Sequence, residues 1–585
     1  MDKRTILAVV LSVVIISVSM IVQGLIWPPQ PAVPQAASQS TAAPAESATA
    51  APTQAPAQVP AAPTPAFQAV AGTEVAEQTV TLQNDVLTLT LSNRGAVVTS
   101  AKLKRHLNRD GTEVEMIQSG TSGEYPFAVS FGDYNTEPAD TVFSVEGPWP
   151  GKPEVVFTAQ LASPSGVPFT LRKTYSLQSS EYMLELRVEM ENSRNEVLNL
   201  GNGEYAYTLS FGPQIGPSYE KLDGRNEYRN YIYRAGGKKK SVRMPREGFK
   251  VLGERVEWVA VTGKYFTVIA LPDATRYEVV YDARPLEGVH DRSAIHFSRP
   301  PAQAAKSSDL FHFYLGPLQR EVLRRYDDAT KNGYGFKQLH LSDTISSSIL
   351  IGWLSTVFRY GLELLYRLIP NYGVGIILMT ILIKFALYPL SKKSFESTAR
   401  MQKLNPKIAE VRERYKGKPE LMNKELAALY KKEGINPLGG CLPLLLQLPI
   451  FFAFYNLLNS QFELRGAPFI SPWISDLSGP ETVLQFGFTI PLLGWSDLKI
   501  LPIVMLVTTF LQTKVSQTPD TGQSNTKVLT YAMPLVFFFI LYNMPSGLVL
   551  YWTVQNITGI VQQLFVNRLA KRKAAEAGEG ARGTS

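Results

Sequence analysis

Cysteine and histidine are scarce in this sequence, and their placement excludes several kinds of site. Cys441 is the only cysteine among 585 residues, so no disulfide framework can hold the chain together. All five histidines lie between residues 106 and 340, so a histidine-metal site within the apolar C-terminal part is excluded. Few residues have the types and spacing of an enzyme active site, and no glycine-rich phosphate-binding loop is present. The sequence therefore predicts a protein that is not an enzyme, with no catalytic residues, no metal and no cofactor.

Charge is also scarce in the second half of the chain. From about residue 346 onward long apolar stretches recur, whereas residues 28–345 are polar and mixed. Because 585 residues exceed what one hydrophobic core organises, we expect a soluble part and a membrane part. The net charge of +8 could indicate nucleic-acid binding, but its distribution favours the basic cytoplasmic loops of a membrane protein. No direct DNA binding is expected.

The first 66 residues predict an anchor followed by a spacer. Lys3 and Arg4 precede an apolar run from Thr5 to Trp27, which is long enough to cross a hydrocarbon layer of ~30 Å. A cleaved signal peptide has a shorter apolar core of ~7–15 residues, so residues 1–27 favour a retained transmembrane anchor. Residues 28–66 are rich in Pro and Ala and lack apolar periodicity, which is typical of a flexible linker.

Residues 67–345 carry the two-residue alternation of β-strands. It is clearest in TVTLQNDVLTLTLSN, EYMLELRVEMEN and KYFTVIALP, with Gly, Pro, Asn and Asp clusters between such runs. These signals predict one large β-sandwich domain. The basic cluster Lys238–Lys240 is expected to be a solvated loop rather than a ligand site.

A helical period begins in the segment 346–370. Its apolar positions include Leu354, Phe358 and Leu362, while Arg359 and Glu363 fall on another face. The charges make it a poor membrane span, so we expect an amphipathic helix in the outer membrane interface. Packing of this helix on the β domain remains the alternative.

Residues 371–567 contain the remaining candidate spans, and a basic tail follows at 568–585. The spans lie at about 373–391, 438–459, 500–515, 528–543 and 547–566. Residues 392–433 hold twelve Lys or Arg against six Glu and read as a helical hairpin around a turn at 416–419. Because basic residues are enriched in cytoplasmic loops, the positive-inside rule predicts that this hairpin and both termini lie in the cytoplasm. The β domain then lies in the periplasm. Six transmembrane helices satisfy this orientation.

Lys384 is the one charged residue well inside a candidate span, in the run ILMTILIKFALYPL. A charge at this depth is costly and indicates a polar cavity. Alternatively, the side chain reaches the headgroups, because the cytoplasmic end lies roughly 10 Å away along the helix. None of the five later spans contains Asp or Glu, which argues against a carboxylate proton relay.

The last span carries a polar stripe. At ~100° per residue one arc holds six residues: Trp552, Gln555, Asn556, Gly559, Gln562 and Gln563. Other spans add Thr380, Gln447, Thr508 and Gln512, and Thr380 lies one turn from Lys384. Ordinary interhelical hydrogen bonding is the alternative, but this number of polar positions beside a lysine favours a hydrated groove.

Three motifs resemble the YidC family of membrane protein insertases. They are KFALYPLSKKSFESTARMQKLNPKI, NPLGGCLPLLLQLPIFFAFY and MPSGLVLYWTVQNITGIVQQ, in this order along the membrane region. The resemblance implies a periplasmic β-supersandwich and a five-helix core with a hydrophilic groove that is open to the cytoplasm and the lipid. It assigns Lys384, where family members generally carry Arg, to attracting acidic parts of the entering chain. It also places Thr380, Gln447 and Trp552 along the groove.

The same resemblance implies an inner-membrane insertase and chaperone that acts alone or with the Sec translocon. Its implied partners are nascent membrane proteins, SecYEG and SecDF, the ribosome and anionic lipids. A channel or secondary transporter that uses the same polar groove remains the alternative function. Five core spans without evident paired repeats argue against many transporter folds.

Overall fold

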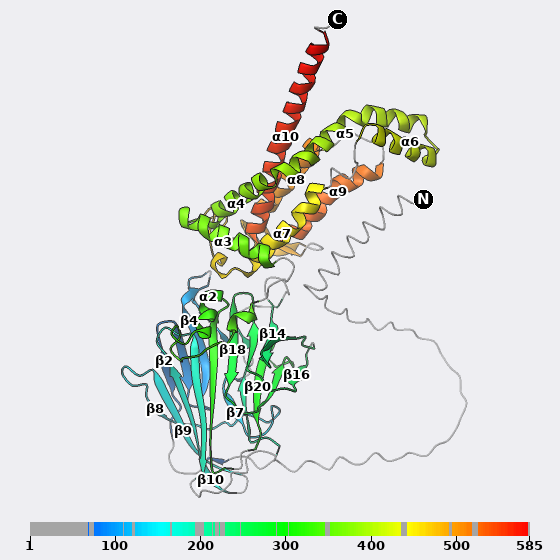
Figure 1. The fold of residues 1–585 in the computed structure, drawn as a ribbon. Coiled ribbons are helices and arrows are strands. Elements are labelled where there is room, and N and C mark those ends of the chain that lie inside the picture. Colours follow the sequence, from blue (N-terminus) through cyan, green and yellow to red (C-terminus); the bar gives the residue numbers. More distant parts are fainter. Residues whose placement is uncertain are drawn as a thin grey trace, which may run out of the picture.

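The computed structural model describes most of the chain beyond the linker. The described ranges are 68–69, 75–345, 352–434, 442–490, 494–516 and 524–582, with short gaps at 109, 120–122, 164–165, 193–203, 213, 217–221, 223–227, 246, 288, 290 and 302–303. The predicted anchor at 1–27 and the predicted linker at 28–66 lie outside the described residues. The described chain forms a β part and a helical part that meet end to end (Figure 1).

Antiparallel sheets make up the β part. The largest sheet has the order β1-β9-β10-β11-β21-β18-β17-β14-β15, with β8 paired to β9. Its strands are β1 (Gln68–Ala69), β8 (Ser144–Glu146), β9 (Glu154–Ala162), β10 (Pro168–Leu177), β11 (Met183–Asn192), β14 (Asn230–Ala235), β15 (Lys238–Val242), β17 (Trp258–Thr262), β18 (Phe266–Pro272) and β21 (Lys306–Pro317).

Smaller sheets complete this part. A five-stranded sheet has the order β16-β19-β20-β12-β7 and a four-stranded sheet the order β2-β3-β4-β5. Their strands are β2 (Thr79–Gln83), β3 (Leu87–Ser92), β4 (Val97–Leu107), β5 (Glu113–Glu115), β7 (Ala128–Ser130), β12 (Tyr207–Phe211), β16 (Phe249–Leu252), β19 (Glu278–Asp282) and β20 (Ala294–Arg299). A short pair is formed by β6 (Ile117–Gln118) and β13 (Gln214–Ile215). A separate hairpin of β22 (Leu484–Ile490) and β23 (Trp495–Leu498) belongs to the helical part.

The alternation of apolar and polar residues explains why these segments form strands. In β3 the three leucines are buried and the residues between them are half-buried, because successive side chains of a strand point to opposite faces. The three alternating segments of the sequence form strands as predicted, in β2 and β3, β11 and β18. Between the sheets, Phe127 meets Phe313 edge to face with ring centroids 4.7 Å apart, and Phe313 also stacks on Phe211.

The expected loop at Lys238–Lys240 is wrong, because these lysines begin β15 at the edge of the largest sheet. Gly236 and Gly237 both have positive φ and form the two-residue turn from β14 into β15. Lys240 also forms an ion pair with Glu254 at 2.6 Å. Lysines on an edge strand discourage pairing with another chain, so the charge cluster is compatible with a strand.

The helical part contains α3 (Gly352–Leu368), α4 (Tyr372–Ala386), α5 (Tyr388–Arg414), α6 (Pro419–Lys432), α7 (Leu442–Ser460), α8 (Ile500–Ser516), α9 (Ser524–Leu541) and α10 (Ser546–Arg582). A short helix, α2 (Arg320–Arg324), and the 3-10 turns at Arg325–Asp327, Leu341–Thr344 and Phe462–Leu464 lie at the boundary with the β part or near it. None of the described helices combines the length and the apolar character needed to cross a bilayer, so the six spans stay a prediction.

Two local features shape the path from α4 to α6. Asn371 caps α4 by accepting a hydrogen bond from the Val374 amide at 3.1 Å. The segment expected as one span at 373–391 is divided between α4 and α5, and Pro389 lies in the first turn of α5, where its missing N–H costs nothing. Gly417, with φ +85°, turns the chain from α5 to α6. Those two helices enclose a small core of Leu404, Ile408 and Leu426.

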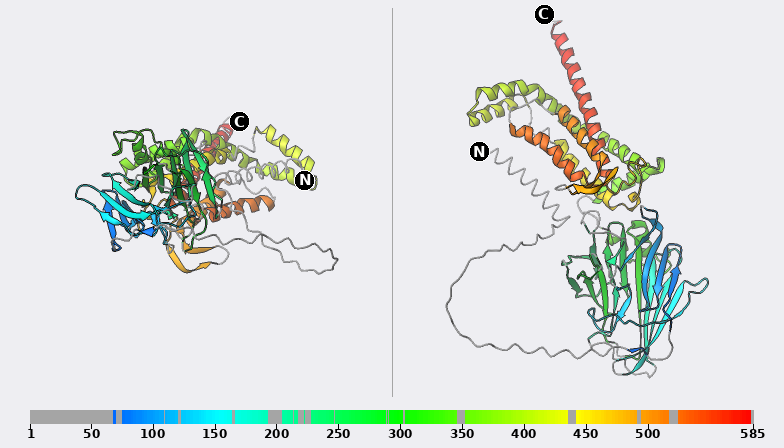
Figure 2. Two further views of the ribbon diagram at one scale, coloured as in Figure 1. Left: turned by 90° about the horizontal axis from the view of Figure 1, so that it is seen from below. Right: turned by 180° about the vertical axis from the view of Figure 1, so that it is seen from behind.

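Helix α10 contacts α4, α7 and α8, and it extends past them on the side away from the β part, as the view from behind also shows (Figure 2). The β part and the helical part are joined by polar contacts. Lys264 donates to the Ser478 carbonyl at 3.1 Å, and Arg465 donates to the Leu107 carbonyl at 2.8 Å. Because these contacts link distant parts of the sequence, they fix how the two parts meet.

Candidate functional site

Lys384 lies in the last turn of α4. It is half-buried, and its neighbours Leu382 and Phe385 are exposed. Its ammonium forms no hydrogen bond or ion pair with a described residue. The carbonyl end of a helix favours a cation, so this position supports the positive charge while leaving it available to an external anion.

Thr380 lies one turn before Lys384 and is fully buried. Its hydroxyl donates to the Ile376 carbonyl of its own helix at 2.6 Å. The hydroxyl is therefore satisfied within α4, as is common for threonine in membrane helices.

A hydrogen-bonded cluster connects α8 with α10. The side-chain amide of Asn556 is 4% exposed and donates to the hydroxyls of Thr508 at 3.1 Å and Thr509 at 2.8 Å. Thr508 and Thr509 both donate in turn to the Met505 carbonyl. This network fastens α10 to α8, which is the interhelical role that the sequence left open as the alternative.

A second cluster connects α7 with α10. Gln555 donates to the Tyr551 hydroxyl at 3.0 Å, and Gln447 also hydrogen-bonds Tyr551. Trp552 meets Phe451 edge to face, with ring centroids 5.1 Å apart, and lies 5.2 Å from Phe537 of α9. The indole therefore presents an aromatic surface between three helices.

Further along α10 the polar groups are less completely paired. Gln563 is 1% exposed and donates to Asn567 at 3.0 Å, while Gln562 is half-buried. The amide of Gln512 lies against Gly559, where a Cβ atom would come within 2.8 Å of its Nε2 atom. A side chain at 559 would require the flexible end of Gln512 to move.

Three amide oxygens on α10 are buried without a donor in the described part of the chain. They are the Oε1 atoms of Gln555, Gln562 and Gln563. A buried polar atom without a partner costs about 1–3 kcal/mol, and water or a polar polypeptide can remove this cost. The final helix therefore carries acceptors for a partner outside the protein's own hydrogen bonds.

The predicted residues thus fall into groups rather than one continuous cluster. Eight of them lie on α10 or on α7 and α8, which contact it: Gln447, Thr508, Gln512, Trp552, Gln555, Asn556, Gln562 and Gln563. Thr380 and Lys384 lie on α4, which contacts α10, but neither shows a side-chain hydrogen bond to this group among the described residues.

Sequence reasoning missed Tyr551 and Thr509. Tyr551 is fully buried, stacks on Phe454 at 4.5 Å and accepts from Gln555 four residues later. The i, i+4 spacing of a tyrosine and a glutamine was a usable signal. Thr509 gave no such signal, because only packing shows that Asn556 reaches two adjacent threonines.

In chemical terms the site offers one ammonium, buried amides, hydroxyls and an aromatic surface. Among the described residues, no group of three or more His, Cys, Asp or Glu side chains could hold a metal ion. The arrangement therefore supplies one positive charge and several hydrogen-bonding groups.

Two family models match the chain. The model described as "60Kd inner membrane protein" matches residues 364–574, and the model described as "YidC periplasmic domain" matches residues 79–353. Together they cover the β part from β2 onward, helices α4 to α9 and most of α10.

Full-length relatives are also similar to this chain. The membrane protein insertase YidC of Treponema denticola is 36% identical over 585 residues, covering 98% of this chain and 100% of the relative. That of Treponema pallidum is 34% identical over 620 residues, with 98% and 100% covered.

Solved structures give weaker likenesses. A crystal structure of an active YidC insertase, with its first transmembrane domain resolved, covers 83% of this chain and 92% of its own, at 17% identity and a TM-score of 0.35. A putative aldose 1-epimerase of Escherichia coli K12 covers 41% of this chain and 100% of its own, at 11% identity and a TM-score of 0.27. Neither structural likeness carries an argument about function.

Proposed function

The chain belongs to the YidC family of membrane protein insertases, as its motifs predicted, and we propose that it inserts and folds inner-membrane proteins through a hydrated groove beside α10. The β part corresponds to the periplasmic domain of the family. The finer steps of this proposal concern the topology, the groove and the role of Lys384.

The proposed topology has six spans, with both termini and the α5–α6 hairpin in the cytoplasm. It is supported by the charge of that hairpin, twelve basic against six acidic residues at 392–433. Helices α5, α6 and the end of α10 also lie on the side away from the β part (Figure 1). Under this topology the β part faces the periplasm and the groove opens toward the cytoplasm.

The observation that carries the groove is the set of unpaired amide oxygens on Gln555, Gln562 and Gln563. In hydrocarbon such atoms would be costly, so water reaching along α10 explains their presence in a membrane helix. A client's polar tail entering the groove would then exchange water for protein contacts in stages. The cost of moving it across the bilayer falls accordingly.

Lys384 supplies the charge in this proposal. Its ammonium attracts acidic residues of the entering tail for a short time, because it has no ion-pair partner among the described residues. A membrane potential that is positive outside then draws each negative charge outward by ~2.3 kcal/mol per 100 mV. Lysine keeps the charge but lacks the planar fork of arginine, so the attraction is less directional.

In the last step of insertion, the client's apolar helix partitions from the protein into the lipid bilayer. It gains roughly 0.8 kcal/mol per buried methylene, so no nucleotide is needed for this last step. The proposed partners are nascent membrane proteins, the ribosome, the Sec translocon (SecYEG and SecDF) and anionic lipids. We propose that the protein acts alone or beside the translocon.

Neutralising Lys384 tests the proposal. We expect Lys384→Gln to reduce the insertion of single-span clients with acidic tails by about tenfold, and of clients with neutral tails by much less. Lys384→Arg should restore insertion. Lys514→Gln, which removes an exposed lysine in the last turn of α8, is the matched control.

Insertion into proteoliposomes gives the readout, by protease protection of the client's tail. Equal insertion of acidic-tailed clients by the Lys384→Gln variant and the parent chain would remove the role of Lys384. Client-independent solute flux through the same proteoliposomes, without insertion, would instead favour a channel.

A further inference from the structure

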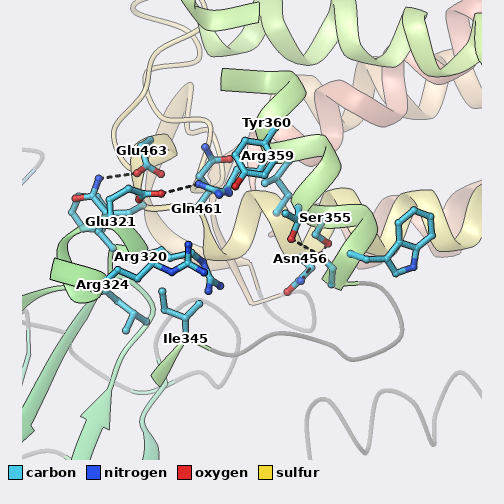
Figure 3. A pocket seen from close by; sticks show the side chains of 17 residues that line it. Arg320, Glu321, Arg324, Ile345, Ser355, Arg359, Tyr360, Asn456, Gln461 and Glu463 are labelled. Carbon is cyan, nitrogen blue, oxygen red and sulfur yellow. Dashed lines mark hydrogen bonds and ion pairs between the residues drawn. The ribbon is translucent and has the colours of Figure 1, made fainter. Parts of the chain in front are cut away.

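A second polar cavity lies where the β part meets the helices, far along the chain from the polar stripe of α10. It has a volume of about 410 Å³. Its walls come from α2, from the first half of α3 and from the end of α7 (Figure 3). No part of the proposed groove belongs to it.

Arginines dominate the charge of this cavity. Arg320 and Arg324 of α2 extend into it, and Arg359 of α3 borders it (Figure 3). Arg359 is already paired with Glu321 and Glu363, both at 3.0 Å. Neither Arg320 nor Arg324 forms an ion pair or a hydrogen bond with a described residue.

The arginines also repel one another. Burial lowers the pKa of Arg320, and the charges of Arg324 and Arg359 lower it further. The two carboxylates that face the cavity already have partners in its wall, Glu321 with Arg359 and Glu463 with Gln319 at 2.9 Å, and Glu321 only partly offsets the repulsion at Arg320. An anion between Arg320 and Arg324 would relieve this repulsion.

An uncharged side chain in the cavity independently indicates a polar ligand. Gln461 follows α7, is 4% exposed and lines the cavity. Both its Nε2 and its Oε1 atoms lack a hydrogen-bond partner among the described residues. A buried amide with neither end paired is costly, and the oxygens of an anion would accept from its Nε2 atom.

An exposed apolar stripe runs from this cavity along α3. It consists of residues at spacings of three and four, on one face of the helix: Trp353, Val357, Tyr360, Leu364 and Leu368. Trp353 is 67% exposed, Tyr360 is 58% exposed, and both also line the cavity. An apolar face with tryptophan and tyrosine at its edge is typical of a helix at the surface of a bilayer.

We propose that this cavity binds the phosphate group of an anionic phospholipid from the outer leaflet. The phosphate lies between Arg320 and Arg324 and accepts from Gln461, while the acyl chains follow the stripe of α3. Arginine pairs recognise phosphate oxygens through several donors at once. The bound lipid would hold α2 of the β part against α3 and α7, and so fix the β part relative to the membrane.

This inference rests on the proposed position of α3 at the outer face of the membrane. A lipid is favoured over free phosphate because the apolar stripe begins at the cavity itself. A zwitterionic headgroup fits less well, since its cation would come close to two unpaired arginines.

Lipid binding to the purified full-length protein tests the site. Native mass spectrometry compares retention of phosphatidylglycerol with that of phosphatidylcholine. We expect the Arg320→Gln/Arg324→Gln variant to bind phosphatidylglycerol at least tenfold more weakly, and Gln461→Leu several-fold more weakly. Arg172→Gln/Arg276→Gln removes two exposed arginines of the β part and should leave binding unchanged.

Three results would overturn the inference. One is equal phosphatidylglycerol binding by the site variant and the parent chain. Another is equal retention of phosphatidylcholine and phosphatidylglycerol by the parent chain. The third is a rise in melting temperature with inorganic phosphate that the site variant abolishes, without any phosphatidylglycerol binding, because free phosphate would then be the ligand.

A separate measurement checks the position of α3. A bimane label on Val357→Cys, in a Cys441→Ser background, should be quenched by lipids that carry a nitroxide on their acyl chains. Absence of quenching would refute the proposed topology of α3. Quenching without headgroup selectivity would refute the phosphate site alone.

Discussion

A charge cluster around Asp282 in the β part and the amides along α10 in the helical part are buried in different ways. In the β part, Asp282 is fully buried and contacts Arg284 at 2.7 Å, Arg292 at 2.8 Å and His296 at 3.4 Å. Burial alone would raise the pKa of Asp282, but hydrogen bonds from His296 and Arg284 hold it below its usual range. Lys173, also fully buried, donates to three backbone carbonyls. The buried charges of Asp282 and Lys173 therefore have partners within the fold.

In the helical part the buried polar groups along α10 are neutral, and three of their oxygens lack a donor among the described residues. A fold that needed only stability would replace such groups with apolar ones, because a half-satisfied amide costs free energy. The charge cluster around Asp282 is thus buried with partners from the same fold, whereas the amides of α10 keep oxygens without a donor among the described residues. Under the proposed function, those oxygens accept hydrogen bonds from water or from a client in the groove.

The largest effect is expected from breaking a charge cluster of the β part. Asp282→Ala removes the buried carboxylate that Arg284, Arg292 and His296 contact, and among the described residues only Arg292 keeps a second carboxylate, that of Glu124, so the free energy of unfolding should fall by about 3 kcal/mol. Chemical denaturation of the full-length protein, followed by the β-sheet circular dichroism signal, measures it. Asp140→Ala, which breaks an exposed pair with Arg94, should have little effect. Equal effects would contradict the distinction drawn for the β part.

A smaller loss is expected where the helical part does satisfy its polar groups. Asn556→Ala removes the link from α10 to Thr508 and Thr509 and should cost about 1–2 kcal/mol. A thermal scan in detergent would record it as a lower melting temperature. Thr558→Ala, which loses a hydroxyl bonded only to its own helix, should change the melting temperature less. A larger loss for Thr558→Ala would refute the interhelical role of Asn556.

The boundary between the two parts should respond to pH. His106 bonds Tyr182 at 2.9 Å and meets Phe462 of the helical part edge to face. Burial, with Arg465 and Arg105, lowers its pKa to about 4. Because the unfolded imidazole has a pKa of ~6.5, stability is complete above that pH and falls as the pH drops toward 4.

We expect a loss of roughly 1 kcal/mol between pH 7 and pH 5, reduced from a full shift by solvent screening. Melting temperatures at the two pH values measure it in the parent chain and in His106→Phe, which keeps an aromatic ring but cannot titrate. An identical pH dependence in both chains would show that His106 is not the responsible group.

The smallest effect on stability is expected from the unpaired amides, and it sharpens the comparison most. Gln563→Leu removes a buried oxygen that has no donor among the described residues, and it also removes the hydrogen bond to Asn567. Because the gain and the loss oppose each other, the free energy of unfolding should change by less than about 0.5 kcal/mol. Insertion of acidic-tailed clients should nevertheless fall several-fold. The exposed substitution Val561→Leu is the control. Loss of stability in parallel with insertion would indicate that Gln563 is structural.

Local patterns in the sequence determined much of this protein. Alternation in residues 79–92, 183–192 and 266–272 determined strands, because the two faces of a strand differ at every step. Helical spacing placed Gln555, Asn556 and Gln563 on one arc of α10. The three motifs were enough to predict the family.

Only the tertiary structure decided what those side chains meet. Asn556 and Thr508 are 48 residues apart, and Gln461 and Arg320 line one cavity from segments far apart in the sequence, so no local period relates them. Lys238–Lys240 became an edge strand because β14 was available to pair with it. Periodicity selects the face on which a residue lies, whereas long-range packing selects the partner on that face. That is why the sequence predicted a polar helix but not which of its amides would remain unpaired.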